Sequence, residues 1–335
     1  MTRSPKKTPR KKPKAAKSPA MALLPGVLKR QTRAIARMIS VAEAARPEDR
    51  KALAEIYRHA GRAHVIGLTG VPGSGKSTLA TRLIKAARAS GRTVGVVAID
   101  PSSPFSGGAI LGDRVRMSEL AGDDGVFIRS MATRGALGGL ARASLEAIDV
   151  LDAAGFDLVL VETVGVGQDE VDVVQVAHTV VVVSAPGLGD EIQAIKAGIL
   201  EIADIHVVSK CDRADANATI TDLKGMLALG VRTAGLGDKA WPVPVVPTSA
   251  EKNHGIDELL ATIDRHGRHL KDSGVLEIRR RQIMEMRVLK TAEDIVRKRV
   301  RARRDRLQGL MKRVIDRKMD PHQAAKALLK AINGD

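Results

Sequence analysis

Gly70-Val71-Pro72-Gly73-Ser74-Gly75-Lys76-Ser77 is the most informative run of residues in this 335-residue chain. It fits G-x-x-x-x-G-K-[ST], the spacing of loops that hold the phosphates of nucleoside triphosphates. The apolar run 64–69 before it is typical of a buried strand, and residues 77–84 after it have the apolar spacing of a helix. Because strand, glycine loop and helix follow in the required order, we interpret the stretch as a phosphate-binding loop. The alternative, a glycine-rich turn with a chance Lys-Ser, lacks this context.

The residue types in the loop each have a physical reason. Glycines let backbone N–H groups surround a β-phosphate at the N-terminus of the helix. Lys76 is expected to reach the β- and γ-phosphate oxygens, and the hydroxyl of Ser77 is expected to bind Mg²⁺. The nucleotide-binding residues expected from this stretch are Gly70, Val71, Pro72, Gly73, Ser74, Gly75, Lys76, Ser77 and Thr78.

Short apolar runs alternate with helical stretches along the middle of the chain, which predicts a mostly parallel sheet with helices on both faces. The runs are Val65–Leu68, Val94–Ile99, Val126–Ile128, Leu158–Val161, Val180–Val183, Ile205–Val208 and Val243–Val246. Ligands of such α/β sheets bind at the carboxyl ends of the strands. Polar motifs follow directly after these runs, so we expect them to share one site in a P-loop NTPase fold.

Four segments are expected along the chain. They are a disordered basic tail at 1–22, an N-terminal helical segment at 23–62, the P-loop domain at 63–272 and a C-terminal helical arm at 273–335. Apolar residues recur at helical spacing in the arm, which predicts two charged amphipathic helices. Such helices are too polar to form their own core, so we expect the arm to form a homodimer. A solvated hairpin on its own subunit stays open.

Composition narrows the class of protein. The single cysteine, Cys211, excludes an intrachain disulfide and favours a reducing cytoplasm. No apolar run approaches the ~20 residues of a membrane-spanning helix, and the basic start is no secretory signal. The net charge of +17 is concentrated in 1–20 and 271–320, yet aromatic residues make up only 1% and no nucleic-acid motif occurs. We expect no membrane and no nucleic-acid partner; weak polyanion contact of the tail is the minor alternative.

Ser209-Lys210-Cys211-Asp212 follows a predicted strand and resembles N-K-x-D, the motif that selects guanine. The Asp212 carboxylate would accept hydrogen bonds from guanine N1–H and N2–H₂, a donor pair that adenine lacks. The stem of Lys210 would lie over the purine ring. Ser209 stands where the motif has Asn, and a hydroxyl makes fewer contacts than an amide, so we expect a lower affinity for guanine.

Thr248-Ser249-Ala250 follows another predicted strand and resembles the last GTPase motif, whose backbone contacts guanine O6. We therefore expect Ser249 and Ala250 at the base. This short motif carries little weight alone, but its order after the other motifs supports it. Together with Asp212 it favours GTP over ATP.

Asp100 and Glu162 each follow an apolar run, and Glu162 occupies the place of the D-x-x-G motif. Carboxylates at these positions would hold Mg²⁺ directly or through water, and the Gly165 N–H would meet the γ-phosphate. Ordinary polarity at strand ends is the alternative for the two acids. The residues expected to support hydrolysis are Lys76, Asp100, Glu162 and Gly165.

Four longer stretches carry a resemblance to a known family. They are Asp100-Pro-Ser-Ser, Gly107 to Met117, Glu162 to Gln168 and Gly187 to Glu201. These stretches resemble the MeaB/ArgK family, GTPases of the SIMIBI class that act as chaperones of adenosylcobalamin-dependent acyl-CoA mutases, chiefly methylmalonyl-CoA mutase. The resemblance covers about residues 25–330 and leaves out the basic tail.

The resemblance implies a GTPase with a slow intrinsic rate that gates the loading and protection of adenosylcobalamin on a client mutase. The residues it places around Mg²⁺ are Ser77, Asp100, Asp113 and Glu162. It implies switch loops at 101–117, 163–173 and 187–196. In the third loop, the residues implied to couple nucleotide state to the partner are Asp190, Gln193 and Lys196. The family is dimeric through its C-terminal helices, and a homodimer is expected here.

Other functions stay open. The chain lacks the D-x-H-x-x-G signature of B₁₂-binding mutase domains, so we expect no cobalamin site of its own. An ATP-dependent kinase linked to basic amino-acid (LAO/AO) transport is the main alternative, and Asp212 argues against it because that function needs adenine. A metal-delivery GTPase usually carries His-rich or paired-Cys sites, whereas this chain has one cysteine and eight scattered histidines.

Overall fold

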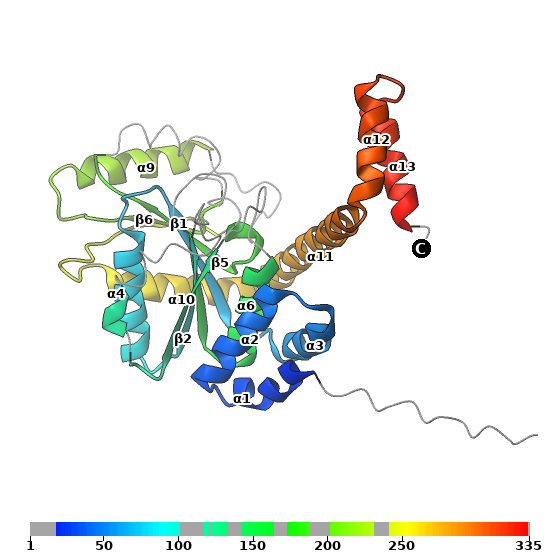
Figure 1. Cartoon of the computed structure of the whole chain (residues 1–335). Helices are drawn as coiled ribbons and strands as arrows, with labels where there is room; N and C mark the ends of the chain where they lie inside the picture. The colour runs from blue at the N-terminus through cyan, green and yellow to red at the C-terminus, as the bar shows by residue number, and fades with distance from the viewer. Residues whose placement is uncertain are drawn as a thin grey trace, which may run out of the picture.

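A computed structural model describes residues 18–100, 117–120, 122–132, 142–163, 173–187, 202–230 and 241–333 (Figure 1). Its centre is a seven-stranded sheet in the order β3-β2-β4-β1-β5-β6-β7, and every described strand pair is parallel. The strands are β1 His64–Gly70, β2 Val94–Asp100, β3 Val126–Ala132, β4 Leu158–Thr163, β5 Thr179–Ser184, β6 Ile205–Val208 and β7 Val245–Pro247. The predicted α/β fold with a parallel sheet is confirmed.

The helices frame this sheet and extend beyond it. The 3₁₀ helices are η1 Pro19–Leu23, η2 Pro47–Asp49, η3 Ser118–Leu120 and η4 Val173–Gln175. The α-helices before β6 are α1 Leu24–Leu28, α2 Thr32–Ala44, α3 Arg50–His59, α4 Lys76–Ala89 and α6 Arg142–Ala153. Those after β6 are α9 Ala216–Gly230, α10 Ile256–Asp272, α11 Val275–Ala302, α12 Arg304–Ile315 and α13 Pro321–Asn333.

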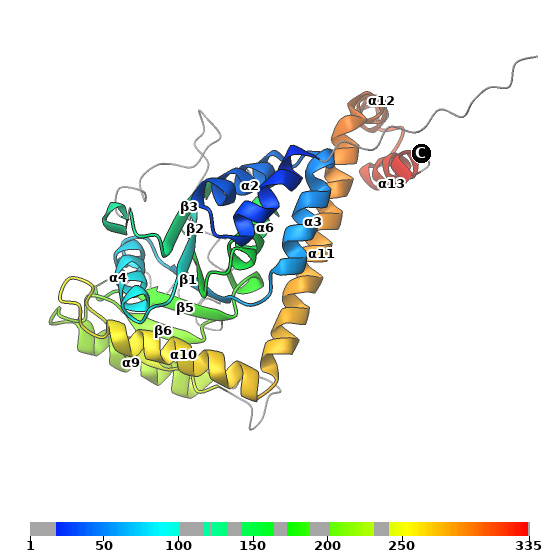
Figure 2. The same cartoon turned by 90° about the horizontal axis from the view of Figure 1, so that it is seen from below.

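Strand alternation divides the core into two layers. Val65 of β1 packs with residues of α2, α3 and α6, and its neighbour Ile66 packs with residues of α4 and α10. Successive side chains of a strand point to opposite faces, so both faces of a central strand are apolar when helices cover both. Figure 2 shows these helices on the two sides of the sheet. Because β1 lies between β4 and β5, the loop after it emerges at the centre of the carboxyl edge.

One carboxylate joins the N-terminal helices to the sheet. Asp152 of α6 accepts hydrogen bonds from the backbone N–H groups of Gly61, Arg62 and Ala63, at 2.7, 2.9 and 3.0 Å. These residues connect α3 to β1. A buried carboxylate that satisfies three backbone donors fixes the direction in which β1 enters the sheet.

The C-terminal part forms an arm that projects from the domain (Figure 1). Its first helix, α11, has 28 residues and lies along α3 before it leaves the sheet (Figure 2). Arg279 holds its start by donating to both carboxylate oxygens of Asp204, at 2.6 and 2.8 Å, and Arg287 pairs with Asp149 further along. Beyond α11 the chain continues as α12 and returns beside it as α13 (Figure 1), so the arm contains three helices where the sequence pattern predicts two.

Candidate nucleotide-binding site

The glycine loop connects the end of β1 to the start of α4 through backbone angles that favour glycine. Gly70 has φ 138°, and a Cβ built on it would lie 2.1 Å from the carbonyl oxygen of Val183. Gly73 and Gly75 also have positive φ, at 78° and 82°. Gly75 precedes α4, whose first-turn N–H groups have no partner within the helix and attract anions.

Lys76 lies at the centre of this loop. Its ammonium group donates to the carbonyl oxygens of Gly70, at 2.5 Å, and Val71, at 2.7 Å. The Ser74 hydroxyl also donates to Val71, at 2.8 Å. The loop therefore holds a buried positive charge among backbone groups, which is an arrangement suited to a phosphate chain.

Ser77 and Glu162 are brought together from two elements. The Ser77 hydroxyl donates to a carboxylate oxygen of Glu162 at 2.6 Å, and both side chains are buried. Glu162 is the second-last residue of β4 and lies opposite Leu68 of β1 on one side and Ala98 of β2 on the other. Asp100 ends β2 two residues later, at the same edge of the sheet; its side chain, like Asp113 and Gly165, lies outside the described residues.

Ser209 directly follows β6, and its side chain contacts the phosphate loop. Its hydroxyl lies 2.6 Å from the carbonyl oxygen of Ser74 and 3.1 Å from that of Ser184. A hydroxyl has one hydrogen to donate, and the shorter contact is to the loop. The backbone N–H of Ser209 also donates to Ser184, at 2.8 Å. Ser209 is 5% exposed, so it serves as a buried brace between β6 and the loop.

Lys210 continues this connection on the surface. Its ammonium group donates to the carbonyl oxygen of Gly73 at 3.0 Å, and its φ of 51° lies in the left-handed region, which is rare for a residue with a side chain. The next residue, Cys211, donates its N–H to Thr248, at 3.0 Å. The segment after β6 is thus anchored both to the phosphate loop and to the segment after β7.

A hollow of about 280 Å³ opens beside these residues. The residues lining it are Gly75, Thr78, Leu79, Ser209, Lys210, Asp212, Arg213, Thr248, Ser249, Ala250 and Glu251. A hydrogen bond from Ser249 is the main cause that lowers the pKa of Asp212, so this carboxyl stays ionised at neutral pH. The hollow therefore presents a carboxylate acceptor next to the start of α4.

The segment that carries Ser249 is itself fixed. Ser249 and His254 exchange backbone hydrogen bonds at 3.0 and 2.9 Å, and Gly255, at φ 72°, allows the following turn. The guanidinium of Arg82 in α4 donates to the carbonyl oxygen of Ala250 at 2.9 Å. These contacts hold the wall of the hollow against the helix that begins at the phosphate loop.

The structure brings together most, but not all, of the residues singled out in the sequence. Asp190, Gln193 and Lys196, together with most of the three predicted switch loops, lie outside the described residues. Two contributors were not predicted. Ser184 could have been noticed as a polar residue ending an apolar run, whereas Arg82 lies within a helix pattern and gives no local signal.

Within the described ranges, no group of three or more His, Cys, Asp or Glu side chains is placed to hold a metal ion. Among the helices that the structure describes, none combines the length and apolar character needed to cross a bilayer.

A glycine loop between the central strand of a parallel sheet and its next helix defines a P-loop nucleotide-binding protein. The family model described as "Methylmalonyl Co-A mutase-associated GTPase MeaB" matches residues 35–305. The chain belongs to the MeaB family and is a GTPase, which confirms the resemblance seen in the sequence motifs.

Individual relatives agree with this assignment. The chain is 48% identical over 93% of its length to a "Putative GTPase" of Pyrococcus abyssi, of which it covers 96%. It is 36% identical to GTPase ArgK of Escherichia coli over 72% of this chain and 73% of that protein. Among solved structures, one titled "Crystal structure of LAO/AO transport system kinase" has a TM-score of 0.70, with 24% identity and coverage of 96% of this chain and 100% of the other. At this identity the match supports the fold alone.

Proposed function

We propose that this protein binds GTP and Mg²⁺ at the phosphate loop and acts as a chaperone that gates the loading and protection of adenosylcobalamin on an acyl-CoA mutase. The client is methylmalonyl-CoA mutase or a close relative. One observation carries the nucleotide half of the proposal: Ser209 and Lys210 donate hydrogen bonds to the phosphate loop, so the loop and the hollow beside it form one continuous site. The description of the family model supports the mutase half.

Guanine selection rests on Asp212. A carboxylate accepts from both the N1–H and the N2–H₂ of guanine, whereas adenine offers neither donor at those positions. Asp212 lines the hollow that also reaches Thr78 at the start of α4. Ser249 and Ala250 also line this hollow, and their backbone is proposed to meet the base oxygen.

The phosphates are assigned to the loop and to Lys76. The triphosphate competes with the carbonyl oxygens of Gly70 and Val71 for the ammonium group of Lys76. Charge-assisted hydrogen bonds to phosphate are stronger than those to neutral carbonyls, so the exchange favours the nucleotide. Gly165, after β4, is proposed to meet the γ-phosphate.

The oxygen donors present suit Mg²⁺, which prefers hydroxyl, carboxylate and water ligands. Ser77 and Glu162 already place a hydroxyl and a carboxylate oxygen 2.6 Å apart at the loop, and Asp100 and Asp113 complete the proposed set. When bound, Mg²⁺ neutralises the negative charge that develops on the phosphates during hydrolysis. Glu162 would hold and orient the ion from a buried position at the end of its strand.

Coupling to the partner is assigned to the third switch loop and to the arm. Asp190, Gln193 and Lys196 are proposed to change contacts between the GTP and GDP states, so the mutase reads the nucleotide state. The arm leaves large apolar side chains exposed, including Val288 at 68% and Ile315 at 74%. We propose that it forms a homodimer, that the complex works in the cytoplasm, and that the cobalamin site belongs to the mutase.

Nucleotide competition tests the first half of this proposal. Binding of a labelled GTP analogue in the presence of Mg²⁺ is challenged with unlabelled GTP, GDP, ATP and ADP. The expected result is displacement by guanine nucleotides at concentrations at least about 100-fold lower than by adenine nucleotides, since two charge-assisted hydrogen bonds distinguish the bases. Equal displacement by ATP would favour the LAO/AO kinase function and overturn the guanine assignment.

A further inference from the structure

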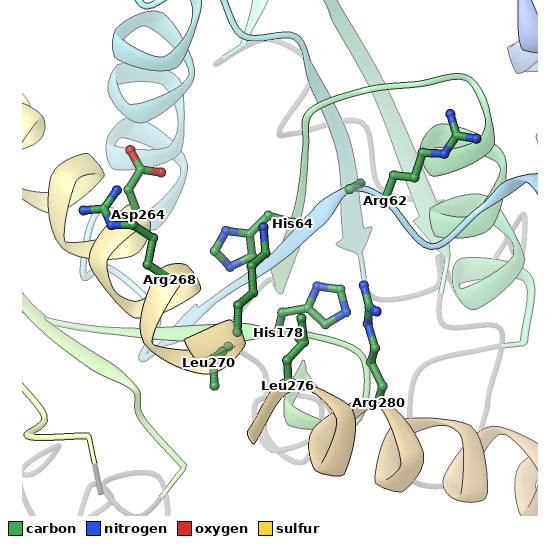
Figure 3. Close-up of a pocket in the computed structure, with 11 residues that line it drawn as sticks. Arg62, His64, His178, Asp264, Arg268, Leu270, Leu276 and Arg280 are labelled. Atoms are coloured by element: carbon green, nitrogen blue, oxygen red, sulfur yellow. The ribbon is translucent and has the colours of Figure 1, made fainter. Parts of the chain in front are cut away.

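A second pocket, of about 210 Å³, lies around the start of β1, at the opposite edge of the sheet from the phosphate loop. Figure 3 draws the residues that line it. Its walls come from four segments: the entry to β1, the residue before β5, the end of α10 and the start of α11. His64 begins β1 and Gly70 ends it, so a full strand, roughly 20 Å at ~3.3 Å per residue, separates the two sites. The pocket therefore cannot be part of the nucleotide site.

The walls of this pocket are cationic. Arg62, Arg268 and Lys271 line it, and none of them makes an ion pair with any residue that the structure describes. Arg280 also lines it and donates to the carbonyl oxygen of Gly61 at 3.0 Å. Long basic side chains gathered around one hollow repel one another unless an anion lies between them.

The pocket contains one carboxylate among its described lining residues, and that charge is already neutralised. Asp264 pairs with Arg92, which lies outside the pocket, at 2.7 Å. Arg280 is also 3.2 Å from Glu277, an exposed residue one turn earlier in α11, and such a surface pair contributes little. The lining thus keeps an excess of positive charge that no described acid offsets.

Two imidazoles form the floor between these cations (Figure 3). Nδ1 of His178 accepts a hydrogen bond from the Val65 N–H at 3.2 Å, so in the neutral ring the proton is on Nε2, which can donate into the pocket. Nε2 of His64 is 2.7 Å from the Thr179 hydroxyl. Burial lowers the pKa of His64 to about 4 and that of His178 to about 3, so both rings are uncharged at neutral pH and His178 supplies a hydrogen-bond donor rather than a charge.

A glycine in the middle of α10 makes room for this floor. A Cβ built on Gly267 would lie 2.9 Å from Cε1 of His64. Glycine inside a helix lowers stability by roughly 0.5–1 kcal/mol relative to alanine. Gly267 therefore does not stabilise α10; it leaves space for the His64 ring. The His64 ring can therefore lie against α10, beside Lys271.

From this geometry we propose that the pocket binds the phosphate group of a small phosphate monoester, held by Lys271 and Arg280, with Arg62 and Arg268 at the rim. A phosphate monoester carries a charge between −1.5 and −2 at neutral pH and three acceptor oxygens, which matches several cations and an imidazole N–H better than the single charge of a carboxylate. The volume is below the ~300–1,000 Å³ of pockets for drug-sized ligands, so it suits a small group.

Calorimetric titration with methyl phosphate tests this proposal. The full-length protein is first saturated with Mg²⁺ and a non-hydrolysable GTP analogue, so that the phosphate loop cannot take the probe. Lys271→Gln removes one exposed charge from the pocket, and Arg265→Gln removes one from the same helix, where Arg265 instead pairs with Glu258 at 2.7 Å. We expect saturable binding by the native chain, weakened about tenfold or more by Lys271→Gln and less than about twofold by Arg265→Gln.

A spectroscopic signal locates the binding. Trp241 is the one tryptophan of the chain, and its ring lies 5.0 Å from that of His266. His266 in turn is 2.8 Å from the Thr179 hydroxyl that contacts His64. Methyl phosphate should therefore change Trp241 fluorescence in the native chain and in Arg265→Gln at matched concentrations.

Several results would overturn the proposal. One is that methyl phosphate shows no saturable binding, and another is that acetate binds as tightly as methyl phosphate. A third is an equal loss of affinity in the two variants, which would indicate diffuse surface charge. Circular dichroism and GTP turnover of both variants should match those of the native chain, because neither residue contacts the nucleotide site.

Discussion

The hydroxyl of Ser209 donates a hydrogen bond to the backbone carbonyl of Ser74 at 2.6 Å. This contact joins the segment after β6 to the phosphate loop. An asparagine amide at this position has two N–H donors, whereas the hydroxyl has one. The role we assign to Ser209 is therefore to brace the loop rather than to contact the base.

Ser209→Ala is predicted to weaken the binding of nucleotides by the same factor whichever base they carry. The change leaves the Ser74 carbonyl without this donor, at a cost of about 1 kcal/mol or about fivefold in affinity. Because the loss acts through the phosphate loop, GTP and inorganic triphosphate should be affected alike in equilibrium binding. Ser209→Asn restores an amide donor and should bind GTP at least as tightly as the native chain. A loss confined to GTP would instead assign Ser209 to the base.

Asp212→Asn is predicted to move selectivity from guanine to xanthine. The amide oxygen still accepts from N1–H, but the amide N–H₂ faces the guanine N2–H₂, and two donors repel. Xanthine has a carbonyl at that position, which accepts from the amide. Affinity for GTP should fall by about 100-fold, and affinity for XTP should rise. Competition binding with both nucleotides checks this, and unchanged GTP affinity would remove Asp212 from the base site.

Gly70→Ala is predicted to destabilise the domain strongly. The added Cβ would meet the Val183 carbonyl oxygen at 2.1 Å in a backbone conformation, φ 138°, that disfavours side chains. We expect a loss above about 3 kcal/mol in the free energy of unfolding. Gly91→Ala is the matched control: its φ is also positive, at 81°, but nothing lies within 4 Å of the added atom, so only about 1–2 kcal/mol should be lost. Equal midpoints of urea unfolding would contradict the close approach.

Stability is predicted to fall as the pH drops below about 6.5. Burial lowers the pKa of His64 and His266 to about 4 and that of His178 to about 3, from a usual value of 6.5. Between these values the unfolded chain binds more protons than the folded chain, so acid favours unfolding. Each histidine contributes up to about 1.4 kcal/mol per pH unit. The negative charges of Asp204 and Asp264 raise the pKa values of these histidines and so reduce the loss of stability in acid. The positive charges of Arg279 and Lys271 lower the pKa values and so increase that loss.

Urea unfolding at pH 7.0 and 5.5 measures this dependence. We expect a loss of about 2–4 kcal/mol in the native chain. His178→Asn keeps an acceptor near the Val65 N–H and should lose a smaller amount between the two pH values. His322→Asn, at an exposed position of α13, should behave like the native chain. Stability that does not change between pH 7.0 and 5.5 would contradict the neutral, buried state of these rings.

The fold and the centre of the site could be predicted because their signals are local. The glycine loop, the strand before it and the helix after it are contiguous, and the alternation of apolar runs predicts a parallel sheet directly. Glu162 and Asp212 could be placed because each follows a run that becomes a strand. Neighbouring parallel strands bring their carboxyl ends to one edge.

Other contacts could not be predicted because they depend on register and packing between distant segments. The bond from Ser209 to Ser74 joins residues 135 positions apart. The second pocket gathers residues from four segments that are far apart in the sequence, and none of them belongs to a motif. The last helix of the arm, α13, was also missed, since it follows the two apolar stretches on which the prediction of two helices rested.

We propose that the nucleotide state of this GTPase serves as a timer that a mutase reads. The most direct measurement is the GTP hydrolysis rate of the purified chain, alone and with an adenosylcobalamin-dependent acyl-CoA mutase from the same organism. Lys76→Ala is the control for contaminating activity, because it removes the ammonium group that lies in the phosphate loop. We predict a slow rate alone and an increase of about tenfold or more with the mutase. A rapid rate that no such mutase changes would overturn this proposal.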